Sequence, residues 1–358
     1  MLIYWLLFFC VFLFALQERS EIYEVGTFNF SKVPVTWLVM LIALTLLIGF
    51  RHVVGGDWFS YIRHFEIVKS VDFVDLFYLK DPGYQFLNYI ASYIGGGIYT
   101  VNLIAGGFFS FGLILFCRTQ PRPMLALLAA IPYMTIVISM GYSRQSIALG
   151  IAMIALCSLI HKSILKFTLW IILAGLFHKS AVLLIPLAAL LSSKNKWLSI
   201  VWAGIAGFAA YSTLLADHVD TLYTSYVEAQ YQSQGALIRV IMCVFPASLF
   251  LYFRHLFNMT DKEKQLWTWF SILSVVAFLM LFLTSASTAV DRVALYLLPL
   301  QLVIFSHLPE VLGRPDKLNI HWVILICFYY ALVQFVWLFF ASHAFAWLPY
   351  QFYPFTLL

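Results

Sequence analysis

The chain has 358 residues, of which 63% are hydrophobic and only 10% are charged, and its formal net charge is +5. This composition excludes a soluble globular domain, and the scattered basic residues do not form the patch that nucleic acid requires. Uncharged stretches run from Pro82 to Cys117, from Gln265 to Val290 and from Leu318 to Leu358, each longer than the roughly 20 apolar residues of a spanning helix. Because β-barrel alternation is absent from the sequence, we expect an all-α polytopic membrane protein.

Taken in chain order, the apolar runs predict about twelve membrane crossings in a single integral membrane domain that covers residues 1–358. The first run lacks the basic region and the small-residue cleavage site of a signal peptide, so we expect a helix that is retained. The runs lie at residues 1–16, 33–50, 98–117, 124–141, 145–160, 164–177, 180–192, 197–216, 237–253, 265–285, 290–308 and 319–341.

Residues 51–97 are predicted to form an external region with two juxtamembrane helices. An amphipathic pattern from Asp57 to Ser70 indicates the first helix. The second segment, Tyr84 to Gly97, starts after Asp81-Pro82 and ends at three consecutive glycines. These boundaries favour a short helix along the membrane over another crossing.

Lysine and arginine residues set the expected orientation, because cytoplasmic loops carry an excess of them. Strict alternation of the helices brings all six basic loops to the cytoplasmic side and leaves both chain ends outside. Residues 164–192 then form a hairpin with His178 and Lys179 at its tip, and its short arms predict a tip recessed below the outer surface. The basic loops contain Arg19 and Lys32, Arg118 and Arg122, Lys162 and Lys166, Lys194 and Lys196, Arg254, Lys262 and Lys264, and Arg314 and Lys317.

Four polar clusters, none of them used to set the orientation, reach the outer face in this topology. Ionisable groups near membrane depth are costly and usually mark a functional site. The candidate catalytic residues are His178 and Asp57, and the candidate diphosphate- or substrate-binding residues are Arg51, Tyr61, Arg144, Gln145, Lys179, Arg292 and Tyr296.

Simpler explanations exist for part of this set. Arg144 and Arg292 are the hardest to explain in another way, because each adjoins a long uncharged run and has no evident carboxylate partner. The simpler explanations for the others are snorkelling at a helix end (Arg51, Lys179), a helix N-cap (Asp57) and a local ion pair (Asp291).

The combination of residue types indicates the class of ligand. Two or more arginines with a histidine and a carboxylate suit a diphosphate, because guanidinium groups bind phosphate oxygens in a fixed fork. The sequence has no Walker loop and no GxSxG, HExxH or CxxC motif, so soluble nucleotide chemistry is not indicated. All five cysteines lie inside apolar runs, and the outer face has no paired carboxylates at ligand spacing. We therefore predict no metal ligands and no cofactor, and the sequence leaves metal dependence open.

Four motifs carry a family resemblance, namely Phe50-Arg51-His52-Val53-Val54-Gly55-Gly56-Asp57-Trp58-Phe59-Ser60-Tyr61, Ser143-Arg144-Gln145-Ser146-Ile147-Ala148, Leu173-Ala174-Gly175-Leu176-Phe177-His178-Lys179-Ser180-Ala181, and Arg292 with Tyr296. At these positions the chain resembles the EpsG-like family of bacterial polysaccharide polymerases, within the broader Wzy-type group. The resemblance covers nearly the whole chain, and the motifs are weak singly but fairly specific together. One departure is Gly55-Gly56 before Asp57, where the family pattern has glycine and then a small polar residue.

The resemblance implies glycosyl transfer at the outer face of the bacterial inner (plasma) membrane, in a fold related to the GT-C class of glycosyltransferases. The expected function is a polymerase for O-antigen, capsule or exopolysaccharide, which joins oligosaccharide repeat units carried on undecaprenyl diphosphate within the membrane lipid. A flippase and a chain-length regulator are the protein partners that this function suggests. The alternatives left open are a flippase or transporter of lipid-linked glycan, and a single-sugar glycosyltransferase or ligase with a polyprenyl-linked donor.

Two residues are candidates for the base that takes the proton of the attacking sugar hydroxyl. His178 has an ordinary pKa of about 6.5 and a recessed position beside the leaving group. Asp57 is the type of residue to which the GT-C resemblance points, and desolvation would raise its pKa. The sequence favours His178, with Asp57 positioning the acceptor or sharing the role.

Overall fold

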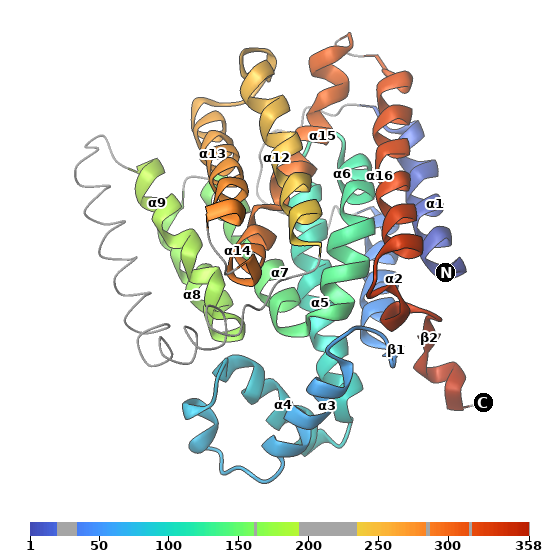
Figure 1. Cartoon of the computed structure of the whole chain (residues 1–358), viewed down its shortest axis with the longest axis vertical. Helices are drawn as coiled ribbons and strands as arrows, with labels where there is room; N and C mark the ends of the chain where they lie inside the picture. Colours follow the sequence, from blue (N-terminus) through green and yellow to red (C-terminus); the bar gives the residue numbers. More distant parts are fainter. Residues whose placement is uncertain (20–33, 161–162, 193–234, 284–286, 315–316, 358) are drawn as a thin grey trace.

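The computed structural model describes residues 1–19, 34–160, 163–192, 235–283, 287–314 and 317–357. These residues form a helical bundle, and their only sheet pairs two short strands, β1 (Arg51–His52) and β2 (Gln351–Phe352) (Figure 1). The apolar run predicted at 197–216 lies outside the described residues, as do the basic residues Lys32, Lys162, Lys194 and Lys196.

Each of the other eleven predicted apolar runs is helical. Three runs are not continuous α-helix: a π-helix follows α6, the 3-10 helix η4 precedes α9, and a 3-10 turn separates α14 from α15. The bundle helices are α1 (Leu2–Gln17), α2 (Val35–Gly49), α5 (Gly97–Cys117), α6 (Pro123–Ala130) with η3 (Ile131–Ser139), α7 (Ser143–Ile160), α8 (Ile164–Phe177), η4 (Lys179–Leu184) with α9 (Ile185–Ser192), α12 (Ala236–Phe253) with η7 (Arg254–Leu256), α13 (Asp261–Leu283), α14 (Ser287–Ala294) with η8 (Leu295–Leu297) and α15 (Pro299–Leu312), and α16 (Ile320–Phe340).

Six of the described helical segments are long and apolar enough to span a membrane, judged by length and composition. Four further helical segments, α1, α2, α6 with η3, and α8, are apolar but shorter. The chain is therefore a helical membrane protein, while the twelve crossings stay a prediction. The six segments are Gly97–Cys117, Ser143–Ile160, Ala236–Leu256, Asp261–Leu283, Val290–Leu312 and Ile320–Phe340.

One end of the bundle is organised around Arg122, whose side chain is fully buried. Its guanidinium donates hydrogen bonds to Glu310 Oε1 at 2.7 and 2.9 Å and to the carbonyl oxygens of Glu18 (2.8 Å) and Lys317 (3.1 Å). The ends of α1 and α15 and the starts of α6 and α16 therefore meet at this arginine.

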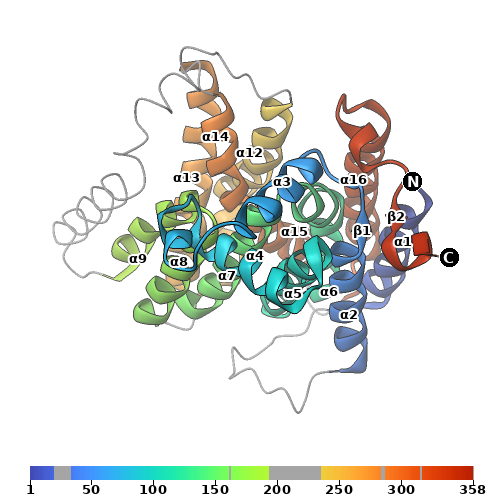
Figure 2. The same cartoon turned by 90° about the horizontal axis from the view of Figure 1, so that it is seen from below.

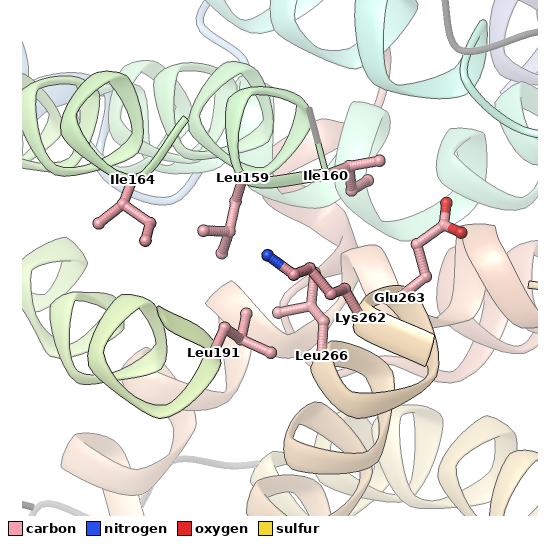
Figure 3. A pocket seen from close by; sticks show the side chains of 7 residues that line it. All are labelled: Leu159, Ile160, Ile164, Leu191, Lys262, Glu263 and Leu266. Carbon is pink, nitrogen blue, oxygen red and sulfur yellow. The ribbon is translucent and has the colours of Figure 1, made fainter. Parts of the chain in front are cut away.

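The ends of α7 and α9 and the starts of α8 and α13 line a small cleft (Figure 3). The ring of Phe116, at the end of α5, lies 6.1 Å from that of Trp267 in α13, which connects the cleft with the surroundings of Arg122. Residues that border each of the six basic loops thus gather at one end, as strict alternation predicts. The cleft is lined by Leu159, Ile160, Ile164, Leu191, Lys262, Glu263 and Leu266.

Two amphipathic helices, α3 (Trp58–Val68) and α4 (Pro82–Ile94), lie across the opposite end and are joined through η2 (Asp75–Tyr78) (Figures 1 and 2). The buried residues of α3 are Trp58, Tyr61, Phe65 and Val68, so apolar positions three and four residues apart form the face that rests on the bundle. Both predicted juxtamembrane helices are present. With 11 and 13 residues, they are too short to cross a membrane.

The segment after α16, which contains η9 (Ala344–Trp347), β2 and η10 (Tyr353–Leu357), folds back over this end. Strand β2 pairs antiparallel with β1, just before α3. The Gly55 amide donates to the Ala346 carbonyl oxygen (2.8 Å), and the Tyr4 hydroxyl donates to that of Trp347 (2.9 Å). Both chain ends therefore lie at the end opposite the Arg122 cluster, as the alternation predicts.

The two ends of the bundle should react differently with a membrane-impermeant maleimide. Ser60 in α3 and Asn258 after η7 are both exposed, so they form a matched pair at opposite ends. In a background with the exposed Cys10 replaced by Ala, Ser60→Cys should be labelled in intact spheroplasts. Asn258→Cys should be labelled only after permeabilisation, because it lies among the basic loops. The reverse pattern would invert the orientation.

Candidate functional site

The loop before Asp57 has a backbone that only glycine can adopt at one position. Gly55 has a φ of +106°, and a Cβ there would lie 2.3 Å from the carbonyl oxygen of Met140. Val53 has a φ of 51°, which is strained for a β-branched residue. Asp57 therefore has a fixed position at the N-cap of α3, yet its side chain makes no cap hydrogen bond. A side-chain cap does not explain this aspartate.

Arg144, at the start of α7, forms an ion pair with Asp81, at the start of α4. The distance from Nη1 to Oδ2 is 2.7 Å, and the two side chains are 23% and 1% exposed. The Arg144 guanidinium also lies 5.9 Å from the ring centroid of Tyr61 in α3. The sequence shows no carboxylate partner near Arg144, and the structure supplies one from 63 residues away in the chain.

Arg51, a predicted substrate ligand, is enclosed by protein and is only 1% exposed. Its guanidinium donates hydrogen bonds to the Ile48 carbonyl oxygen (2.6 Å), to Asn102 Oδ1 (2.9 Å) and to Ser143 Oγ (2.7 Å). These acceptors belong to α2, α5 and α7. The structure corrects the prediction: Arg51 ties three helices together behind the site, and its burial leaves no face for a ligand.

His178 lies between α8 and η4, at the tip of the predicted hairpin. Its Nδ1 is 2.6 Å from the Ser180 hydroxyl oxygen and 3.4 Å from that of Tyr296, which follows α14 in η8. Burial, together with the positive charges of Arg144 and Arg292, lowers the pKa of His178 to about 3. The imidazole is therefore neutral at physiological pH.

Asp291 in α14 forms a two-pronged ion pair with Arg239 of α12. Nε and Nη2 of the arginine lie 2.6 Å from the two carboxylate oxygens. An ion pair does engage Asp291, but the prediction of a local pair is wrong, because the partner is 52 residues distant in the chain. The next residue, Arg292, is exposed.

Asp57 is influenced by charged residues from the other polar clusters. Burial raises the pKa of its carboxyl group, and the positive charges of Arg144, Arg292 and His64 oppose that rise. Helices α3, α7 and α14 therefore present charged groups to one another across the site. Because His178 is influenced by the same two arginines, both candidate catalytic residues lie within the electrostatic reach of Arg144 and Arg292.

Lys80 adds a cation that the sequence analysis did not single out. Burial lowers the pKa of its ammonium group; Asp81 opposes this, and Arg144, Arg292 and Lys179 reinforce it. A signal was present in the sequence, because Lys80-Asp81 directly precedes the uncharged run at 82–117. The cations around Asp57 and Asp81, namely Lys80, Lys179, Arg144 and Arg292, outnumber these two carboxylates. This excess of positive charge suits a ligand with more than one negative charge.

The remaining predicted residues lie around the same group. Tyr61 is 4% exposed and lies against the Arg144 guanidinium, and Tyr296 is 2% exposed beside His178. Gln145 is buried, and its Nε2 has no hydrogen-bond partner among the described residues. Within that part of the chain, no group of three His, Cys, Asp or Glu side chains could hold a metal ion.

The Asp81–Arg144 pair should contribute more to stability than an exposed pair at the same end. Lys69 and Glu66 in the α3 region provide the control, since their side chains are 46% and 58% exposed. A double-mutant cycle with Asp81→Asn and Arg144→Gln should give a coupling energy of about 1–3 kcal/mol in detergent-solubilised unfolding. The Lys69→Gln, Glu66→Gln cycle should give less than about 1 kcal/mol. Equal coupling energies in both cycles would contradict a special role for the buried pair.

Comparison with known proteins places these features in a family. No curated protein and no solved structure matches the chain. The model of the EpsG family matches residues 35–352, a range that includes α2, the α3–α4 layer, the charged group around Asp57 and strand β2. Since this match covers most of the sequence, the chain belongs to the EpsG family.

Proposed function

We propose that this protein is a glycosyltransferase that polymerises oligosaccharide repeat units carried on undecaprenyl diphosphate, at the outer face of the bacterial inner membrane. Membership of the EpsG family suggests a function of the polysaccharide-polymerase type. The observation that supports the chemistry is the Asp57 carboxylate, which has no cap hydrogen bond and lies close to Arg144 and Arg292. A relation to the GT-C fold class and twelve crossings belong to the same proposal.

The reaction needs few groups, because the leaving group is already a diphosphate. The hydroxyl oxygen at the non-reducing end of one repeat attacks the anomeric carbon of the glycan held on the lipid. The bond from that carbon to the diphosphate oxygen breaks, and the diphosphate leaves with the electron pair. Arg144 and Arg292 stabilise its charge by hydrogen bonds that strengthen as the bond breaks, and a base takes the hydroxyl proton.

We assign the base to Asp57 and a positioning role to His178, which reverses the preference drawn from the sequence. Burial raises the pKa of Asp57 and makes its carboxylate more basic, whereas the pKa of His178 falls to about 3. The hydroxyl of Ser180, 2.6 Å away, can donate to His178 Nδ1, and the Tyr296 hydroxyl lies 3.4 Å from the same nitrogen. The ring proton then lies on Nε2, which makes His178 a hydrogen-bond donor toward a ligand.

Two other functions are compatible with a lipid-linked glycan. A transporter would carry polar groups near the middle of the membrane and repeated halves, whereas the charged group described above gathers at one end of the bundle. A single-sugar transferase or a ligase would use the same chemistry but transfer only once.

Reconstitution with a lipid-linked oligosaccharide distinguishes the three functions. Proteoliposomes with the donor and acceptor repeats in the outer leaflet should yield a ladder of products that differ by one repeat. A single product would indicate a transferase or ligase, and movement of unchanged substrate between leaflets would indicate a transporter. Either result would overturn the proposal.

Replacing either arginine should slow polymerisation strongly. Arg144→Ala and Arg292→Ala should each lower the turnover rate by about 10²–10³-fold, because a donor to the developing charge is lost. Lysine at either position should restore only part of the rate, since it lacks the fork geometry. Arg63→Ala is the control: Arg63 lies on the exposed side of α3 at the same end. A full rate in both alanine variants, at normal protein levels, would remove the arginines from the mechanism.

The pH dependence should identify the base. Burial raises the pKa of Asp57, so its carboxylate fraction, and with it the rate, should fall as the pH is lowered through that raised pKa. Asp57→Asn should lower the rate by about 10²–10⁴-fold and abolish this acid limb. His178→Gln should keep the acid limb at a reduced rate. An inactive His178→Gln beside an active Asp57→Asn would exchange the two roles.

A further inference from the structure

A group of aromatic side chains at the α3 end takes no part in the chemistry above. His52 belongs to β1, Tyr99 begins α5 and Tyr353 follows β2, and we call these three the aromatic platform. We propose that the aromatic platform binds the growing glycan by stacking against its sugar rings, and so retains the chain between successive additions. This inference rests on the proposed polymerase function.

The platform consists of one stacked pair of tyrosine rings with the histidine ring beside it. Tyr99 and Tyr353 lie face to face, with centroids 3.6 Å apart and planes 15° apart. The His52 ring lies 6.1 Å from Tyr99 and 6.0 Å from Tyr353, at 27° and 35°. His52 Nδ1 is also 2.5 Å from the Tyr99 hydroxyl oxygen. The residues come from three separate parts of the chain, so folding builds the platform as a unit.

The platform combines ring faces with polar edges, and all three of its side chains are partly exposed. Aromatic faces carry partial negative charge and attract the C–H bonds on one face of a sugar ring. The tyrosine hydroxyls and the imidazole can bond to sugar hydroxyls at the same time. Exposed Gln351 and Thr356 flank the platform in sequence and add further hydrogen-bonding groups. A purely apolar ligand would use none of these polar groups.

Strand β1 connects the platform directly with Asp57. Asp57 lies five positions after His52, so their Cα atoms are at most about 18 Å apart. The ring of Trp58, the residue after Asp57, lies 6.0 Å from that of His52 and 5.9 Å from that of Tyr99. A short oligosaccharide can therefore contact the platform while its end is at the carboxylate.

The platform is fixed by backbone contacts that do not depend on its rings. The Tyr353 amide donates to the Phe50 carbonyl oxygen at 2.8 Å, and the pairing of β1 with β2 continues from that contact through Arg51–Phe352 and His52–Gln351. Removing the Tyr353 ring should therefore leave the loop that carries Asp57 in place. A Tyr353 variant can therefore distinguish a defect in glycan retention from a defect in catalysis.

Tyr93 provides the matched control, because it is a tyrosine at the same end of the bundle, 88% exposed in α4 and outside the platform. If the platform residues were only part of an aromatic belt at the membrane interface, Tyr93→Ala should have the same effect as a platform variant. If they bind glycan, it should leave the products unchanged.

The test compares Tyr353→Ala and Tyr99→Ala with Tyr93→Ala in proteoliposomes supplied with lipid-linked repeats. We expect the mean product length to fall at least threefold in both platform variants, and the rate of the first joining step to fall less. Saturation-transfer NMR with free oligosaccharide of two repeats should show contacts with the wild type that Tyr353→Ala loses.

The outcomes separate the two proposals. If the wild type makes no ladder, the polymerase function fails, and the NMR measurement tests the platform alone. A normal ladder in both platform variants, or the same shortening in Tyr93→Ala, overturns glycan binding by the platform. An equal fall in first-step rate and product length also overturns it, because the rings would then only position the Asp57 loop.

Discussion

The ion pair between Asp81 and Arg144 is the contact on which the arrangement of the site depends. It joins α4, which lies across the end of the bundle, to the first turn of α7, and its carboxylate is almost completely buried. A buried charge without a partner is costly, so the two elements are held together by more than apolar packing. The residue before Arg144 accepts a hydrogen bond from Arg51, which follows α2. The contacts of Ser143 and Arg144 therefore fix α2, α4 and α7 relative to one another.

Four of the described arginines show two kinds of environment, and the difference separates support from chemistry. Arg122 and Arg51 are enclosed, and protein oxygens accept most of their hydrogen bonds. Arg144 has one bonded carboxylate and remains partly exposed, and Arg292 is exposed beside the same site. Only the second kind has donor capacity that a ligand can reach. A charged residue near the membrane is thus a candidate for the site, but only a charged side chain that a ligand can reach can take part in binding.

Local patterns in the sequence predicted the helices well, because apolar runs and amphipathic spacing are properties of neighbouring residues. The face of α3 that contains Tyr61 and Phe65 is an example. The pairing of Arg144 with Asp81 and of Asp291 with Arg239 was not predictable in this way, since 63 and 52 residues separate the partners. Periodicity also could not show that Arg51 is buried, because three other elements enclose it. The sequence therefore identified the polar clusters but not which members face a ligand.

The proposed site has a charge balance that changes during the reaction. Burial raises the pKa of Asp57, while the positive charges of Arg144 and Arg292 oppose that rise. A diphosphate bound to the arginines would offset their charge and make Asp57 a stronger base at the moment when the acceptor hydroxyl must lose its proton. Departure of the diphosphate would restore the influence of the arginines and release that proton. The same two cations would thus serve the leaving group and the base in turn, which explains why the carboxylate lies beside them without an ion pair of its own among the described residues.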